Sequence, residues 1–281
     1  MAEGRGRRDL RDAPREALSR EQVLAAVRTN GRALRSVPAQ LRRDREVVFA
    51  AVQQEGQALA FAPAKFRRHK TAAFAAVRQN GWALHAASDE LKGDRDLALA
   101  AVANYGRAFR VVARRLREDR ELALVAMAQD GSALQFASAA LQGDRGVVIA
   151  AVRQNGCALQ FAAAELQQDR DVALVAVRQS GWAFRYVAES LTRDREVALE
   201  AVRQDGRALQ FASADLRQDR EVACAAVSQN GYALLHVAGD IAEDREVTLV
   251  AVQQHGAALA YAPEHLQQDR EVVLAVVAND G

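Results

Sequence analysis

The pattern of apolar and polar positions repeats every 25 residues along this chain, and residues 194–218 form one such unit. Within "DREVALEAVRQD" the apolar residues lie at helical spacing on more than one side, and Glu200 stands among them. The spacing predicts a helix of about three turns, sandwiched between neighbours and exposed along one edge. The apolar positions are Val197, Ala198, Leu199, Ala201 and Val202.

The second half of the unit predicts two shorter elements. After Gly206 the apolar residues Ala208, Leu209 and Ala212 return at helical spacing, which favours a second, shorter helix. Serine or proline then stands at position 20 in six of the ten complete units. An apolar residue, here Leu216, follows three positions later. Because proline suits the first turn of a helix, we expect a short helical turn before the next unit begins.

Recurring aspartate and glycine residues are the predicted helix caps. Aspartate opens nine of the eleven units and predicts an N-cap, because its carboxylate can accept the free amides of the first turn. Glycine at position 13 is expected to end the helix in the left-handed conformation. The predicted N-caps are Asp44, Asp94, Asp119, Asp144, Asp169, Asp194, Asp219 and Asp244. The predicted helix-ending glycines are Gly31, Gly56, Gly81, Gly106, Gly131, Gly156, Gly181, Gly206, Gly231 and Gly256.

A fixed short period is the signature of an array in which each unit buries its apolar face only against its neighbours. The sequence therefore predicts an all-α fold, an α-solenoid of about ten 25-residue repeats of either hand. A leucine-rich β-repeat is disfavoured, because the apolar core is alanine-rich and begins at a helix cap. Residues 1–18 are expected to be a basic tail with a degenerate capping half-repeat. Residues 19–281 are expected to form a single array, ten full units and a final half unit over 269–281.

The recurring pattern "DREVVLAAV…NGxALxxAsxxLxxDREV" resembles the repeats of domain-of-unknown-function family 4116. The resemblance covers residues 19–281, with Ser19 and His69 in place of the opening aspartate and Gly146 in place of an acidic residue. These departures weaken individual caps and leave the register intact. The family implies no activity, so the resemblance assigns no catalytic residue.

Composition indicates an intracellular protein. No apolar run approaches the roughly 20 residues that a membrane-spanning helix needs, and residues 1–20 lack the apolar segment of a secretory signal. Cys157 and Cys224 occupy different positions of the unit, so no disulfide framework is expected. We therefore expect a cytoplasmic protein that does not enter a membrane.

No catalytic, metal or cofactor site can be recognised in the sequence. The five histidines fall at five different positions of the unit, and every position-13 glycine stands outside a phosphate-binding motif. The aspartates recur in every unit, whereas an active site is a single constellation of residues. We expect no enzyme, and we expect the position-11 glutamines to form a hydrogen-bonded ladder. Examples are Gln154, Gln179, Gln204 and Gln229.

Variable residues at positions 14 and 17 are the candidate binding site. These positions lie one helical turn apart and mix tryptophan, tyrosine and arginine, the residue types enriched in interface hot spots. The alternative is that the tryptophans merely cover their own glycine turns; the aromatic residues at position 18 are expected to pack. The candidate partner-binding residues are Trp82, Arg107, Trp182, Arg185, Arg207 and Tyr232.

These observations favour a non-enzymatic scaffold that binds an unidentified protein or peptide. One alternative is a helical-repeat nucleic-acid binder. Residues 44–281 carry a net charge of −4, which argues against a nucleic-acid partner. The other is self-association, because Leu274, Val276 and Val277 lie in a final half unit with no following repeat to cover them.

Overall fold

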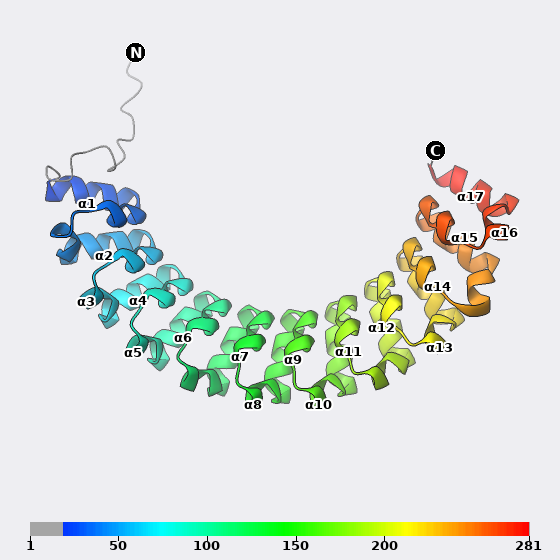
Figure 1. The fold of residues 1–281 in the computed structure, drawn as a ribbon, viewed down its shortest axis with the longest axis horizontal. Helices are drawn as coiled ribbons and strands as arrows, with labels where there is room; N and C mark the ends of the chain where they lie inside the picture. Colours follow the sequence, from blue (N-terminus) through cyan, green and yellow to red (C-terminus); the bar gives the residue numbers. More distant parts are fainter. Residues whose placement is uncertain (1–18, 281) are drawn as a thin grey trace, which may run out of the picture. The chain divides into compact units, whose positions relative to one another are not determined.

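The computed structural model describes residues 19–280, and every regular element in that range is helical. Residues 1–18, the predicted tail and capping half-repeat, lie outside the described residues. The chain divides into two compact units, one ending at Phe136 and one beginning at Ala137. Within each unit the same three-part repeat is stacked in chain order (Figure 1). The predicted all-α solenoid class is confirmed.

Each repeat begins with a long α-helix over positions 2 to 11. In the first unit these are α1 (Arg20–Thr29), α2 (Arg45–Gln54), α4 (Lys70–Gln79), α6 (Arg95–Asn104) and α7 (Arg120–Gln129). In the second unit they are α9 (Arg145–Gln154), α11 (Arg170–Gln179), α12 (Arg195–Gln204), α14 (Arg220–Gln229), α15 (Arg245–Gln254) and α17 (Arg270–Asp280).

The second element of each repeat is a six-residue 3-10 helix that starts at the position-13 glycine. The first unit contains η1 (Gly31–Ser36), η3 (Gly56–Phe61), η4 (Gly81–Ala86), η5 (Gly106–Val111) and η7 (Gly131–Phe136). The second contains η8 (Gly156–Phe161), η9 (Gly181–Tyr186), η11 (Gly206–Phe211), η12 (Gly231–His236) and η14 (Gly256–Tyr261).

A short helix of three to five residues completes the repeat, as the position-20 pattern predicts. It is α-helical in some repeats and 3-10 in others. In the first unit these are η2 (Leu41–Arg43), α3 (Ala64–Arg67), α5 (Asp89–Lys92) and η6 (Arg114–Glu118). In the second they are α8 (Ala139–Gln142), α10 (Ala164–Gln167), η10 (Glu189–Arg193), α13 (Ala214–Arg217), η13 (Gly239–Glu243) and α16 (Glu264–Gln267).

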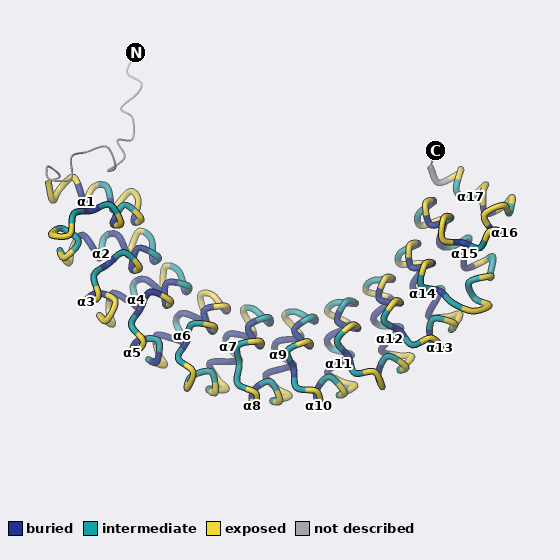
Figure 2. Tube along the Cα trace, viewed as in Figure 1, coloured by how far each residue is buried: buried dark blue, intermediate teal, exposed yellow. Residues whose placement is uncertain are grey.

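The core of each unit runs between consecutive repeats (Figure 2). In α12 the buried residues are the five apolar positions predicted from the sequence, so this helix is covered on more than one side. Ala208 and Leu209 of η11 and Leu216 of α13 are buried as well. Since alanine, valine and leucine fill these positions, the helices pack closely and each repeat is covered by the next.

The predicted aspartate N-caps are confirmed. The Asp194 carboxylate accepts hydrogen bonds from the amides of Glu196 and Val197 at 3.0 and 3.1 Å. Ser19 forms a capping box with Gln22, whereas the side chain of His69 makes no capping hydrogen bond. The same cap is formed by Asp44, Asp94, Asp119, Asp144, Asp169, Asp219 and Asp244.

The predicted left-handed conformation of the position-13 glycines is wrong. Among the described residues the only positive φ belongs to Gly239, which is not at position 13. The long helix ends at position 12 in extended backbone, as at Glu55 (φ −145°), and Gly56 then starts η3. The prediction fails for Gly31, Gly56, Gly81, Gly106, Gly131, Gly156, Gly181, Gly206, Gly231 and Gly256.

Close packing explains the position-13 glycines instead. A Cβ at Gly56 would lie 2.3 Å from the carbonyl oxygen of Ala76 in the next repeat, well inside van der Waals contact. The corresponding distance is between 2.2 and 2.7 Å at eight of these glycines. The next long helix therefore packs directly on the glycine backbone. The eight are Gly31, Gly56, Gly81, Gly106, Gly156, Gly181, Gly206 and Gly231.

Among residues 19–280, no helix combines the length and hydropathy that crossing a bilayer requires.

Candidate functional site

The recurring carboxylates form ion pairs and hydrogen bonds between neighbouring repeats. Arg170 places Nε 2.6 Å from Oδ2 of Asp194 and Nη2 2.5 Å from Oε2 of Glu196, both in the next repeat. The hydrogen bond from Arg170 is the main cause that lowers the pKa of Asp194. Equivalent arginines bridge the other repeats of the second unit, for example Arg195 to Asp219. These aspartates cap a helix and bind an arginine, which accounts for their recurrence without catalysis.

Hydrogen bonds between position-11 glutamines and neighbouring repeats are present in several repeats, and their partners are backbone groups. Oε1 of Gln79 accepts a hydrogen bond of 2.8 Å from the amide of Gly56, and Nε2 donates to the carbonyl of Gln54 at 3.5 Å. Gln179 bonds Gly156 and Gln154 in the same way. The side chains of Gln54, Gln79, Gln179 and Gln229 thus bind the backbone of the preceding repeat.

Within each unit, positions 12, 14, 17 and 18 of consecutive repeats form a side-chain strip along the 3-10 helices, which we call the aromatic strip of that unit. In the second unit, Nε1 of Trp182 donates a 2.7 Å hydrogen bond to Oδ2 of Asp205, and its ring packs edge-on against Phe211. The Arg207 guanidinium lies 5.4 Å from the Trp182 ring centroid and pairs with Asp205 at 3.0 Å. The side chains of Trp182 and Arg207 therefore already form hydrogen bonds and ring contacts within the protein.

The remaining candidates of the second unit are more accessible. Tyr232 is 39% exposed and packs against the rings of His255 and Tyr261. Arg185 is exposed, and no ion pair or hydrogen bond joins its side chain to another described residue. The structure does not gather these two residues with Trp182 into an enclosed site.

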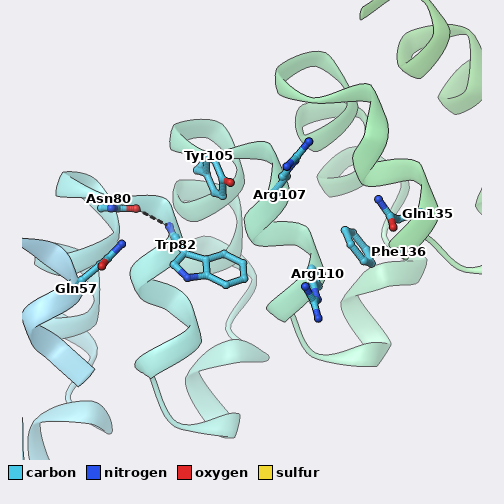
Figure 3. A pocket seen from close by; sticks show the side chains of 8 residues that line it. All are labelled: Gln57, Asn80, Trp82, Tyr105, Arg107, Arg110, Gln135 and Phe136. Carbon is cyan, nitrogen blue, oxygen red and sulfur yellow. Dashed lines mark hydrogen bonds between the residues drawn. The ribbon is translucent and has the colours of Figure 1, made fainter. Parts of the chain in front are cut away.

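In the first unit the aromatic strip encloses a hollow of about 660 Å³, which we call the Trp82 hollow. Figure 3 shows its lining side chains, contributed by successive repeats and grouped around the indole of Trp82. Two of the predicted residues, Trp82 and Arg107, lie here. The full lining is Gln57, Asn80, Trp82, Tyr105, Arg107, Arg110, Gln135 and Phe136.

Two neighbouring rings pack against the indole of Trp82. Its ring stacks on His85 with the centroids 5.5 Å apart and meets the Tyr105 ring edge-on at 6.2 Å. Oδ1 of Asn80 accepts a hydrogen bond of 3.0 Å from the Trp82 amide and so fixes the start of η4 (Figure 3). Trp82 is half-buried, so part of the ring remains available to a ligand.

Of the two arginines that line the Trp82 hollow, one forms an ion pair with a described residue and the other does not. Nε of Arg107 lies 2.6 Å from Oδ2 of Asp130, and this hydrogen bond is the main cause that raises the Arg107 pKa. The Arg110 guanidinium lies 5.7 Å from the ring centroid of Phe136 and has no carboxylate partner among the described residues. Arg110 therefore supplies an uncompensated positive charge beside an aromatic surface.

Several functional residues were missed from the sequence. Arg110 belongs to variable position 17 but was not among the six candidates, and Phe136 was assigned to packing. Asn80 belongs to position 12, where asparagine or aspartate recurs and caps the 3-10 helix. That recurrence was the available signal. Tyr105 occupies the same position without capping, so no pattern marked it.

Other sequence candidates lie elsewhere. Arg28 and Arg178, at position 10 of their units, pair with Glu46 and Glu200 of the following long helices. Among residues 19–280 no group of three histidine, cysteine, aspartate or glutamate side chains could hold a metal ion. Leu274 and Val277 of α17 are 54% and 64% exposed, and self-association through them stays a prediction.

Comparison with known proteins gives one family. The family described as "Domain of unknown function (DUF4116)" matches residues 19–67, 72–117, 94–142, 144–192, 194–240 and 244–281. These six tandem matches cover almost all of the repeat array. No curated protein and no solved structure matches the chain.

Proposed function

The chain belongs to the DUF4116 family, and we propose that it is a non-enzymatic scaffold that binds an extended segment of a partner protein in the Trp82 hollow. The observation that carries the proposal is the juxtaposition of a half-buried indole and an unpaired guanidinium in one hollow. Stacked helical repeats generally present extended surfaces of this kind to other proteins.

The lining supports a peptide more than a small metabolite. Tryptophan, tyrosine and arginine are the side chains that contribute most to protein interfaces, and three of them meet here in Trp82, Tyr105 and Arg110. Oε1 of Gln57 accepts from Arg32 and Nε2 of Gln135 donates to the Ser132 carbonyl oxygen, which leaves Nε2 of Gln57 and Oε1 of Gln135 as hydrogen-bonding groups that suit a peptide backbone. Within the first unit the strip continues beyond the hollow toward Arg35, which lies 6.0 Å from the Phe61 ring centroid, so a segment longer than the hollow can follow it there.

The charges of the hollow favour an acidic segment. Arg107 is already neutralised by Asp130, whereas Arg110 is not. A carboxylate on the partner would form a charge-assisted hydrogen bond with Arg110, and an adjacent apolar side chain would cover the indole of Trp82. The expected motif is therefore an aspartate or glutamate next to a large apolar residue.

A display selection of random 12-residue peptides against the intact chain tests the proposal. We expect enrichment of acidic and apolar residues side by side, and about tenfold or greater loss of affinity in Trp82→Ala and in Arg110→Gln. Arg153→Gln is the matched control, since Arg153 is exposed and lies outside the aromatic strip. Selected peptides that bind all three variants equally would contradict the proposal.

A further inference from the structure

The two compact units carry opposite net charge. Residues 19–136 contain 20 lysines and arginines against 12 acidic residues, a net charge of +8. Residues 137–281 contain 13 arginines against 20 acidic residues, a net charge of −7. The small net charge of the chain is therefore the sum of two larger net charges of opposite sign, one in each unit.

Much of the positive excess lies where short helices join long ones in the first unit. Arg42 and Arg43 end η2, Arg45 starts α2, and Lys65, Arg67 and Arg68 belong to α3 and its end. All of them except the half-buried Arg42 are exposed. We call this surface the basic edge, defined as Arg42, Arg43, Arg45, Lys65, Arg67 and Arg68.

Contacts between neighbouring repeats connect parts of the basic edge. Nζ of Lys65 donates a 3.0 Å hydrogen bond to the carbonyl oxygen of Arg43, which ties the short helices of two neighbouring repeats together. Arg45 lies 5.3 Å from the ring centroid of Phe49, and that ring meets His69 edge-on at 6.0 Å. In Figure 1, α3 lies along the same margin of the first unit as α5.

A local change in the repeat leaves these cations without carboxylate partners. In other repeats an arginine at position 2 binds the acidic residues at positions 1 and 3 of the next repeat, as Arg95 binds Asp119 and Glu121. For Arg45 those positions are His69 and Thr71, neither of which is a carboxylate. Among the described residues, none of the six basic-edge side chains forms an ion pair.

The carboxylates nearest in the chain are already occupied. Arg20 lies 2.8 Å from Asp44 and 2.5 Å from Glu46, and Arg28 also reaches Glu46 at 3.3 Å. These ion pairs keep both carboxylates from neutralising Arg45. The positive field of the basic edge is therefore available to a ligand from outside the chain.

A hydrophilic polyanion fits this surface better than a membrane does. Binding at a membrane interface normally requires apolar side chains that enter the lipid. Among the described residues of the first unit, the exposed large apolar residue is Tyr105, which belongs to the aromatic strip and not to the basic edge. Arginine and lysine side chains are the usual contacts to nucleic-acid phosphates.

We propose that the basic edge binds the phosphate backbone of a nucleic acid. Arg42 and Arg43 recur at the same positions of the next repeat as Arg67 and Arg68, and the axes of packed neighbouring helices lie about 8–10 Å apart. No exposed aromatic side chain belongs to the basic edge, and we therefore expect binding without base selectivity. This site is separate from the Trp82 hollow, and neither proposal depends on the other.

The test is the salt dependence of binding to a fluorescein-labelled oligouridylate of about 20 nucleotides. We expect the intact chain to bind at low salt, with a log affinity that falls linearly with log salt. The variant Arg43→Gln, Arg67→Gln, Arg68→Gln should bind about tenfold or more weakly and reduce the slope by about 2, since each contact to a single strand contributes about 0.7.

The matched control removes the same charge from the second unit as Arg153→Gln, Arg193→Gln, Arg270→Gln. These arginines are exposed and have no ion pair among the described residues. The control should keep both the affinity and the slope, and circular dichroism should show that both variants stay folded. Equal losses in the two variants, no binding by the intact chain, or binding only to vesicles with phosphatidylserine would overturn the proposal.

Discussion

The amide nitrogen of Gly56 donates a hydrogen bond to Oε1 of Gln79, one repeat later, across 2.8 Å. The bond forms because the next long helix packs against bare glycine backbone, where a Cβ would meet the Ala76 carbonyl oxygen at 2.3 Å. One contact thus joins two recurring features of the sequence, the position-13 glycine and the position-11 glutamine.

Gly56→Ala should destabilise the first unit by about 1–3 kcal/mol, because the added methyl group forces the next helix away. The measurement is the urea midpoint of the intact chain followed by circular dichroism. Gly143→Ala is the matched control, since a Cβ there would lie no closer than 3.6 Å to a neighbour. An equal effect of the two substitutions would show that close packing is not the reason for glycine.

Gln79→Ala should cost about 1–3 kcal/mol, because it leaves the buried amide of Gly56 without its acceptor. Gln53→Ala removes an exposed glutamine side chain of the preceding repeat that makes no hydrogen bond among the described residues, and it should be nearly neutral. Urea denaturation of both variants tests whether the position-11 glutamine stabilises the fold more than an exposed glutamine does. Two neutral substitutions would refute the structural role of position 11.

Trp182→Phe should destabilise the second unit by about 1–2 kcal/mol, since it removes the hydrogen bond to the Asp205 carboxylate. Trp82→Phe should have little effect on stability, because Nε1 of Trp82 has no hydrogen-bond partner among the described residues. Thermal denaturation compares the two. The reverse order would mean that Trp82 holds the fold and that Trp182 is the freer of the two residues.

Acid should unfold the second unit between about pH 4 and pH 2. Hydrogen bonds from arginine lower the pKa of Asp194 and Asp219, and that from Arg245 lowers the pKa of Asp269 to about 2. A pKa below the ordinary 3.8 contributes stability above that value, and this stability is lost as pH falls through the folded-state pKa. A circular-dichroism pH titration measures the transition.

Asp219→Asn keeps a capping side chain and loses the ionised partner of Arg195, so its stability should depend less on pH below 5. Asp240→Asn makes the same charge change at an exposed residue that has no side-chain hydrogen bond or ion pair among the described residues. The acid transition of Asp240→Asn should therefore match that of the unsubstituted chain. If Asp219→Asn also matched it, the arginine ladder would not be the cause of the acid sensitivity.

The fold was predictable because each local signal repeats ten times. Asp194 or Asp219 alone would be a weak cap signal, but the fixed period sets the register and the helix class. The role of Gly56 was not predictable, since a left-handed residue and a close packing contact both require glycine. The sequence also did not indicate that η3 is a 3-10 helix. Glu55, the residue at its N-terminus, makes no side-chain capping hydrogen bond that could have marked its start.

The candidate site was predictable only in part. Variable positions 14 and 17 led to Trp82 and Arg107, yet which side chains remain free depends on partners in the next repeat. Asp130 neutralises Arg107 and Asp205 binds Trp182, and both acidic residues occupy position 12, which the sequence interpretation did not use. The uneven charge could be counted from the sequence, but the boundary after Phe136 came from the structure.

The most direct test of the proposed function is the fluorescence of Trp82 in a Trp182→Phe background, where it is the single tryptophan. A peptide from the display selection is titrated into this variant. The expected result is a saturable blue shift of the emission, with the same dissociation constant as fluorescence anisotropy of the labelled peptide, because the ligand covers the indole. Saturable binding by anisotropy with an unchanged Trp82 emission would place the partner elsewhere and contradict the proposed function.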